Sequence, residues 1–197
     1  MDLVELDRIA VREAVRVVDL ARERDWERDT PCAGWTVRRL VAHMTAQHHG
    51  FAAAARGAGG EAEHWRERED ASDPALAHRV AAADVLAAFA EPGVPERQFT
   101  LFELSGSFRG RTAIGFHLVD YVVHAWDVAV SLGTGLDLPD EVLGAALAVA
   151  RRVPTDPAAR AEGSAFAAAL DVPEGAAPLA KTLRLLGRAP ERWPTVV

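Results

Sequence analysis

Phe116-His117-Leu118-Val119-Asp120-Tyr121-Val122-Val123-His124-Ala125-Trp126-Asp127-Val128 is the stretch that decides the fold, because it places ionisable residues in an otherwise apolar helix. At about 100° per helical residue, five polar side chains fall in one stripe roughly 80° wide. They are His117, Asp120, His124, Asp127 and Ser131. A helix that is apolar around the rest of its circumference belongs in a core. The stripe then faces either solvent through a narrow slot or an internal cleft, where buried charges need partners or a metal.

Apolar residues at helical spacing predict further helices on both sides of this stretch, and the central helix itself is expected to cover 112–132. Thr36 is well placed to cap the second helix. Residues 99–109 predict a short hairpin or an extended loop, and 57–74 a surface loop or a ragged helix. The other predicted helices cover 3–24, 36–55, 76–90, 140–152 and 179–186. Four long helices joined by loops predict an all-α four-helix bundle with short additional helices, forming one domain over residues 1–197.

Composition narrows the class of protein and its partners. The 197 residues are 49% hydrophobic and 26% charged, as in a soluble globular domain. A net charge of -7 without a basic block argues against nucleic-acid binding. The acidic N-terminus is not a signal peptide, no apolar run approaches the ~20 residues that span a bilayer, and a single cysteine excludes an intramolecular disulfide. We expect a cytoplasmic protein that acts on a small molecule, with no membrane partner, and whose apolar bundle edge would allow a homodimer.

A metal site is the sharpest functional hypothesis that the residues support. Asp120 and His124 are four positions apart on one helix, so both can reach a single ion, and His43 on the second helix could supply a third ligand. Two nitrogens and one carboxylate with open positions suit a catalytic zinc or another first-row divalent ion. The alternative is an ordinary helical ion pair between Asp120 and His124, worth only ~0.3–0.5 kcal/mol if exposed.

Two other residues of the polar stripe, His117 and Asp127, each have more than one possible role. His117 is either a fourth ligand, a group behind the ligands or a pocket wall. Asp127 could orient His43 or His124 by accepting a hydrogen bond from the ring nitrogen that faces away from the metal, or it is a plain surface carboxylate. His43, His117 and Asp127 are therefore the candidate catalytic residues.

The remaining histidines and the cysteine support weaker hypotheses. His48 and His49 are adjacent, so they point about 100° apart and cannot both share a face with His43. His64 and His78 lie in charged segments and are expected on the surface. Cys32 precedes a helix start that could activate its thiol, although a lone cysteine is more often a small buried hydrophobe.

Two segments far apart in the sequence carry a family resemblance. Residues 30–43 (Thr-Pro-Cys-Ala-Gly-Trp-Thr-Val-Arg-Arg-Leu-Val-Ala-His) and 117–127 (His-Leu-Val-Asp-Tyr-Val-Val-His-Ala-Trp-Asp) resemble the DinB-like superfamily. Within it, the chain is similar to the actinobacterial branch of mycothiol-dependent maleylpyruvate isomerase metal-binding domains, and residues 185–190 (Leu-Leu-Gly-Arg-Ala-Pro) also look like that branch. The resemblance implies a DinB-like four-helix bundle.

The resemblance also implies a ligand set. One histidine on the second helix and an acidic-x-x-x-His pair on a later helix bind a divalent metal, usually zinc, with nickel or iron as alternatives. These positions are His43, Asp120 and His124. The isomerase is similar but has Glu where Asp120 stands. The shorter side chain would bring the ion closer to the helix, or would bind it through water and let His117 bind the ion directly.

The resemblance further implies an activity. The metal would favour the thiolate of a low-molecular-weight thiol, mycothiol, which adds to an electrophilic small molecule for S-transfer or isomerisation. The chain has no evident extra C-terminal domain of the isomerase kind, so we expect a substrate other than maleylpyruvate. Two other hypotheses stay open: a metal-dependent hydrolase or lyase of a specialised pathway, and a non-catalytic bundle that binds a small molecule or serves a stress response.

Overall fold

The fold is an all-α bundle with a small hairpin, as the sequence predicts. A computed structural model describes residues 1–156, 160 and 166–193, so twelve positions of the expected 1–197 domain (157–159, 161–165 and 194–197) lie outside the described residues. The long elements are α1 (Leu3–Val18), α2 (Val37–Ala55), α3 (Pro74–Phe89), α4 (Gly110–Leu132), α5 (Asp140–Ala150) and α6 (Pro178–Leu185). The hairpin pairs β1 (Gln98–Leu101) with β2 (Gly106–Arg109) in antiparallel register.

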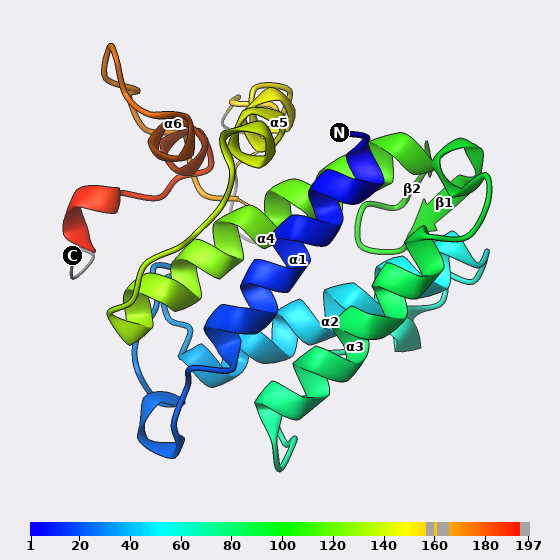
Figure 1. Cartoon of the computed structure of the whole chain (residues 1–197), viewed down its shortest axis with the longest axis horizontal. Helices are drawn as coiled ribbons and strands as arrows, with labels where there is room; N and C mark the ends of the chain where they lie inside the picture. Colours follow the sequence, from blue (N-terminus) through cyan, green and yellow to red (C-terminus); the bar gives the residue numbers. More distant parts are fainter. Residues whose placement is uncertain (157–159, 161–165, 194–197) are drawn as a thin grey trace.

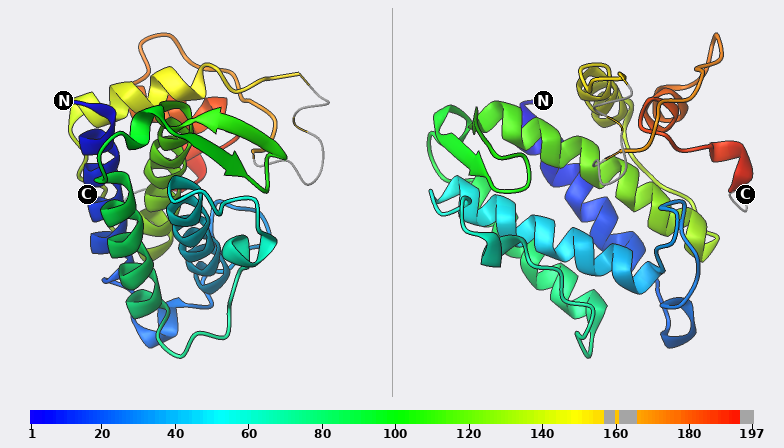
Figure 2. Two further views of the ribbon diagram at one scale, coloured as in Figure 1. Left: turned by 90° about the vertical axis from the view of Figure 1, so that its right-hand side faces the viewer. Right: turned by 180° about the vertical axis from the view of Figure 1, so that it is seen from behind.

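The first four helices form the bundle (Figure 1). Helix α1 packs along α4 and α2 along α3, while α1 also contacts α3 and α2 also contacts α4. Helices α5 and α6 pack on each other, and α5 covers one side of α4 (Figure 2). Helix α4 is thereby enclosed by α1, α2 and α5, which explains why its sequence is apolar around most of its circumference.

Local sequence signals account for the helix ends. The side chain of Thr36 accepts a hydrogen bond from the backbone N–H of Arg39 at 3.3 Å and so caps α2, as predicted. Asp73 caps α3 in the same way, with Pro74 in the first turn. Helix α4 ends at Gly133, whose φ of 70° lies in the left-handed region that glycine adopts without strain.

One predicted helix is too long. The first helix ends at Val18 rather than near residue 24, and a short 3-10 turn (Glu23–Asp25) follows. The carboxylate of Asp25 accepts a hydrogen bond from the backbone N–H of Arg22 at 3.0 Å. Such side-chain to backbone bonds compete with helix continuation, and the turn carries Trp26 into the core.

The segment between α2 and α3 is more firmly attached than a surface loop. It contains a 3-10 turn (Ala62–Trp65), and the indole of Trp65 is buried against Gly50 of α2. Its Nε1 donates a hydrogen bond to the carbonyl of Gly59 at 2.8 Å. A Cβ built on Gly50 would lie 2.3 Å from the Trp65 ring, so only glycine lets the ring approach this closely.

Two glycine substitutions are expected to have opposite effects. Gly50→Ala should lower the free energy of unfolding by about 1–3 kcal/mol, because the Trp65 ring must move out of its site. Gly144→Ala, at an exposed position of α5 with open space around it, should raise it by about 0.5–1 kcal/mol. Urea denaturation of the two variants measures both changes. Equal effects of the two substitutions would contradict the packing of Trp65 on α2.

None of the helices in the described ranges is long and apolar enough to cross a membrane.

Candidate metal centre

The three residues predicted as metal ligands come together between α2 and α4. One ligand atom from each of His43, Asp120 and His124 lies within 4.8 Å of the others. The Nε2 of His124 is 3.3 Å from the Oδ1 of Asp120, and the ring centroids of His43 and His124 are 5.4 Å apart. The side chains of His43 and Asp120 are 17% and 19% exposed, so the group lies at the surface end of the α2–α4 seam.

The chemistry of this group fits a divalent cation. The Oδ2 of Asp120 is buried and has no hydrogen-bond partner among the described residues. Such an orphaned acceptor is costly unless another group satisfies it. Two imidazoles and one carboxylate are a common donor set for zinc and its first-row neighbours, and three protein ligands leave positions open for substrate.

Carboxylates hold the far nitrogens of both histidines. The Nδ1 of His124 is 3.0 Å from the Oδ2 of Asp127, which is one of the two roles expected for this aspartate. The Nδ1 of His43 is 2.9 Å from the Oε1 of Glu67 in the segment before α3. Because each Nδ1 is engaged, the Nε2 atoms are left to face an ion, and the rings are fixed in orientation.

Electrostatics places a charge on His124 when no cation is bound. Burial opposes that charge, but Asp120 and Asp127 outweigh it and raise the pKa of His124 well above its ordinary value. Burial likewise opposes ionisation of Asp120, yet His124 lowers the pKa of that carboxyl to about 2. A cation bound to His124 would therefore displace a proton, which makes its affinity depend on pH.

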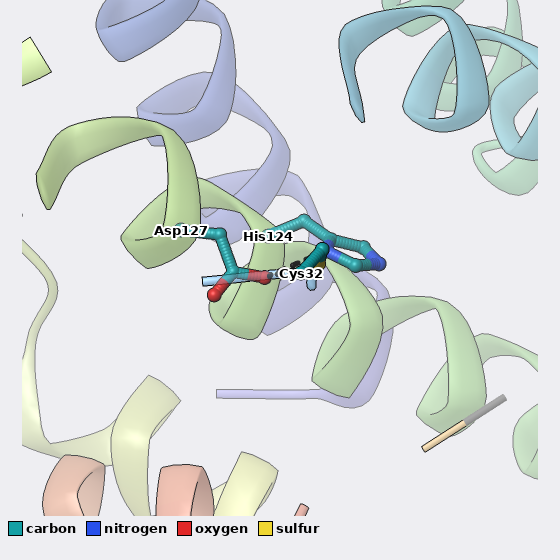
Figure 3. Close-up of side chains that lie close together, drawn as sticks. All are labelled: Cys32, His124 and Asp127. Carbon is teal, nitrogen blue, oxygen red and sulfur yellow. Dashed lines mark hydrogen bonds and ion pairs between the residues drawn. The ribbon is translucent and has the colours of Figure 1, made fainter. Parts of the chain in front are cut away.

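A second group of potential ligands lies on the other side of the His124 ring. Cys32, His124 and Asp127 also have ligand atoms within 4.8 Å of one another (Figure 3). The Nη2 of Arg188 already lies 3.0 Å from the Oδ2 of Asp127 and 3.2 Å from the Sγ of Cys32. The guanidinium supplies the positive charge that this group requires, which favours the His43 side of the ring for a metal.

Comparison with known proteins shows the family. A family model described as the mycothiol maleylpyruvate isomerase N-terminal domain matches residues 8–129. The chain belongs to this family. The matched range contains His43, Asp120, His124 and Asp127, whereas Arg188 lies beyond it. The branch expected from the two sequence motifs is confirmed.

Two relatives and two solved structures are similar to the chain over most of its length. Two uncharacterized proteins from two strains of Mycobacterium tuberculosis are 33% identical to the chain over 166 residues, covering 81% of it and 82% of each relative. A crystal structure of the mycothiol-dependent maleylpyruvate isomerase superposes with a TM-score of 0.56 at 15% identity. A variant of that enzyme with one histidine replaced by alanine superposes with a TM-score of 0.62 at 12% identity. Both matches cover 84% of this chain and 74% of the other, and at this identity they show a shared fold.

His117 belongs to a polar cluster in the interior of the four-helix bundle, separate from the three proposed metal ligands. Its Nδ1 is 2.7 Å from the Oδ1 of Asp7 in α1, and its Nε2 is 3.2 Å from the Nδ1 of His48 in α2. Both ring nitrogens are thus engaged, so His117 has none left to act as a fourth ligand in this arrangement. The ring of His48 lies 5.0 Å from that of His78 in α3, and one polar residue from each bundle helix takes part.

The prediction that His78 lies on the surface is wrong. Its side chain is fully buried, because it occupies the face of α3 that turns toward α2 rather than the charged outer face. Burial lowers the pKa of His78 to about 3, and neither of its ring nitrogens has a hydrogen-bond partner in the part of the chain that the structure describes. Burial also lowers the pKa of His48 well below its ordinary value.

Sequence reasoning missed several residues around the metal centre. In the sequence Glu67 is one of several acids in a charged stretch, and Arg188 stands out only as part of the 185–190 motif. Glu103 of the hairpin turn accepts a hydrogen bond from the Nε2 of Gln47 at 2.8 Å, and partial burial raises its pKa. The partners in these contacts are 24 to 61 positions apart in the sequence. Such separations produce no periodic pattern in the sequence, so only the fold reveals the contacts.

Proposed function

We propose that the protein is a divalent-metal-dependent enzyme that activates a low-molecular-weight thiol, mycothiol, for S-transfer to, or isomerisation of, an electrophilic small molecule. The observation that carries the proposal is the convergence of His43, Asp120 and His124, with a carboxylate behind each histidine. Membership of the mycothiol maleylpyruvate isomerase N-terminal family supports the thiol. The cytoplasm and a homodimer stay predictions.

In this proposal His43, Asp120 and His124 hold the ion, zinc first and nickel or iron as alternatives. A bound divalent cation lowers the pKa of a thiol and so favours the nucleophilic thiolate at neutral pH. Asp127 and Glu67 fix the two imidazole rings and increase their basicity as ligands. His117 is left out of the ligand set and of the substrate contacts, because Asp7 and His48 engage both of its ring nitrogens.

The hairpin turn supplies the substrate side of the site. The charges of His43, Asp120 and Glu67 all act on Glu103, so its carboxyl lies at the edge of the metal centre. A carboxyl with a raised pKa can take the thiol proton or return a proton to the substrate carbon. Phe102 and Leu104 on either side are 48% and 49% exposed, and their apolar side chains suit an organic substrate.

Elemental analysis of tag-free protein, purified without chelator, is the first test. We expect near-stoichiometric zinc, nickel or iron in the wild type, and loss of the metal in His43→Ala and His124→Ala. His64→Ala is the matched control, because its side chain is 39% exposed and pairs with Glu61 at 3.7 Å rather than with a residue of the proposed ligand set. A wild type that is metal-free and takes up no added divalent ion would refute the proposal.

A second measurement separates thiol chemistry from the other metal-dependent reactions. The metal-loaded protein is incubated with electrophilic substrates with and without mycothiol, and the products are analysed. Turnover that requires mycothiol supports the proposal. Turnover without any thiol favours a hydrolase or lyase, and metal binding with no turnover at all favours a non-catalytic bundle.

A further inference from the structure

A cavity of about 620 Å³ lies against a face of α2 that does not include His43. Helices α2 and α3 form two of its walls, and the segment 58–71 forms the third. None of His43, Asp120 and His124 lines it. Its volume falls within the range of about 300–1,000 Å³ that small-molecule sites occupy.

The cavity exists because small side chains line it. Six alanines from the three walls leave space that larger residues would fill: Ala42, Ala46, Ala53, Ala58, Ala71 and Ala77. Two uncharged polar side chains of α2, Thr45 and His49, also line it. The hydroxyl of Thr45 donates to the carbonyl of Val41 at 2.7 Å, so its lone pairs can accept a hydrogen bond. Burial lowers the pKa of His49, which keeps its imidazole neutral at neutral pH.

Charges at the rim of the cavity largely neutralise one another. Four arginines and four acidic residues line it, and each arginine has an acidic partner. Arg56 pairs with Asp84 at 2.8 Å, and Arg68 and Arg66 pair with Glu63 at 2.7 and 3.6 Å. Arg38 pairs at 3.3 Å with Glu27, which lies outside the lining. Because the four positive and four negative side chains of the lining balance in number, the cavity has no net formal charge from them, and an uncharged ligand is the complementary one.

The third wall also reaches the metal centre. Arg66 and Arg68 line the cavity, while Glu67 between them turns the other way and meets His43 at 2.9 Å. The buried indole of Trp65 anchors the segment next to these residues. A ligand that orders or shifts this wall would therefore move the carboxylate that orients His43.

We propose that this cavity is a binding site for an uncharged, predominantly apolar small molecule, and that its occupancy is transmitted to His43 through Glu67. The proposal stands on the cavity and on the Glu67–His43 hydrogen bond, so it does not depend on the metal or on the thiol. By thermodynamic linkage, a change at His43 alters the affinity of the cavity to the same degree.

Nile red, an uncharged dye that fluoresces in apolar surroundings, is the probe for the cavity. We expect saturable binding at one site in the wild type. Ala77→Phe and Ala71→Phe fill the cavity from two different walls, and each should weaken binding by roughly tenfold or more. Ala87→Phe is the matched control, because Ala87 is an exposed residue of α3 outside the lining. Unsaturable binding, or equal binding in the control and in whichever filled variant folds, overturns the site.

The link to His43 has its own readout. In protein labelled with ¹⁵N-histidine, Nile red should shift the ring resonances of His43, which does not line the cavity, and leave those of His117 in α4, also outside the lining, in place. Glu67→Gln should retain dye binding but lose the His43 shift. Saturable binding with no His43 shift in the wild type would contradict the coupling to His43, while the binding site itself would still stand.

Discussion

Between pH 6.5 and about 5 His48 and His78 are expected to cost the protein about 3 kcal/mol of its free energy of unfolding, because both are held neutral in the core. Both side chains are fully buried. The unfolded chain takes up a proton on each imidazole as the pH falls through 6.5, whereas the folded chain does not. Each histidine then costs about 1.4 kcal/mol per pH unit, a large loss beside a typical stability of about 5–15 kcal/mol.

Three further groups with shifted pKa values, His124, Asp120 and Asp7, lose their contribution outside this window or act against the loss. The pKa of His124 is raised, so its stabilising contribution is fully present below pH 6.5 and is lost only as the pH rises through the raised value. The pKa of Asp120 is lowered to about 2, so its contribution is lost only below its unfolded value of 3.8. Burial raises the pKa of Asp7, and its protonation in the folded state relieves a penalty as the pH falls.

Urea denaturation at about pH 7, 6 and 5 measures the effect. The double variant His48→Gln/His78→Gln removes both titrating rings and should flatten the dependence on pH. His64→Gln, at a partly exposed position, should keep the wild-type slope. Repeating the series in Asp7→Asn removes the opposing contribution and should steepen the loss. Equal stability of the wild type at the two ends of the range would contradict the prediction.

The sequence predicts the elements of this fold well because each depends on local signals. Thr36 and Gly133 sit at the ends of α2 and α4 as capping chemistry requires. The first helix is the exception, since Asp25 stabilises a turn by a bond that helical periodicity does not reveal. The ligand stripe of α4 was also readable, because Asp120 and His124 are separated by one helical turn.

The surroundings of the stripe could not be predicted in the same way. Whether His78 faces solvent or the core depends on which side of α3 meets α2, and a helix rich in alanine carries little amphipathic signal to decide this. The pairing of His117 with Asp7 joins residues 110 positions apart. Glu67 lies in a charged segment that contains several acidic residues, and the sequence does not indicate which of them contacts His43. These contacts are products of tertiary packing rather than of sequence pattern.

Removing the positive charge of Arg188 is expected to cost about 3–5 kcal/mol of stability, because it leaves the carboxylate of Asp127 buried without its main partner. Asp127 is fully buried and the Arg188 side chain is 7% exposed, so water cannot replace the guanidinium. Burial alone would raise the pKa of Asp127, and Arg188 and His124 together hold it below its ordinary value.

The test is a double-mutant cycle with Arg188→Met, Asp127→Asn and the combined variant, each followed by urea denaturation. Arg188→Met should be the least stable. The combined variant should recover most of the loss, since an uncharged amide needs no guanidinium and its oxygen can still accept from the Nδ1 of His124. Additive losses in the cycle would contradict a coupled buried pair.

The same pair connects two parts of the chain that the family match treats separately. The matched range ends at residue 129, whereas Arg188 follows α6. Through Asp127, Arg188 stabilises the orientation of His124, so we expect Arg188→Met to weaken metal retention as well as the fold. Arg184→Met is the matched control, because Arg184 lies in α6 and pairs with the exposed Glu191 instead of a buried carboxylate. If both arginine variants retained metal equally well, the C-terminal segment would have no part in holding the site.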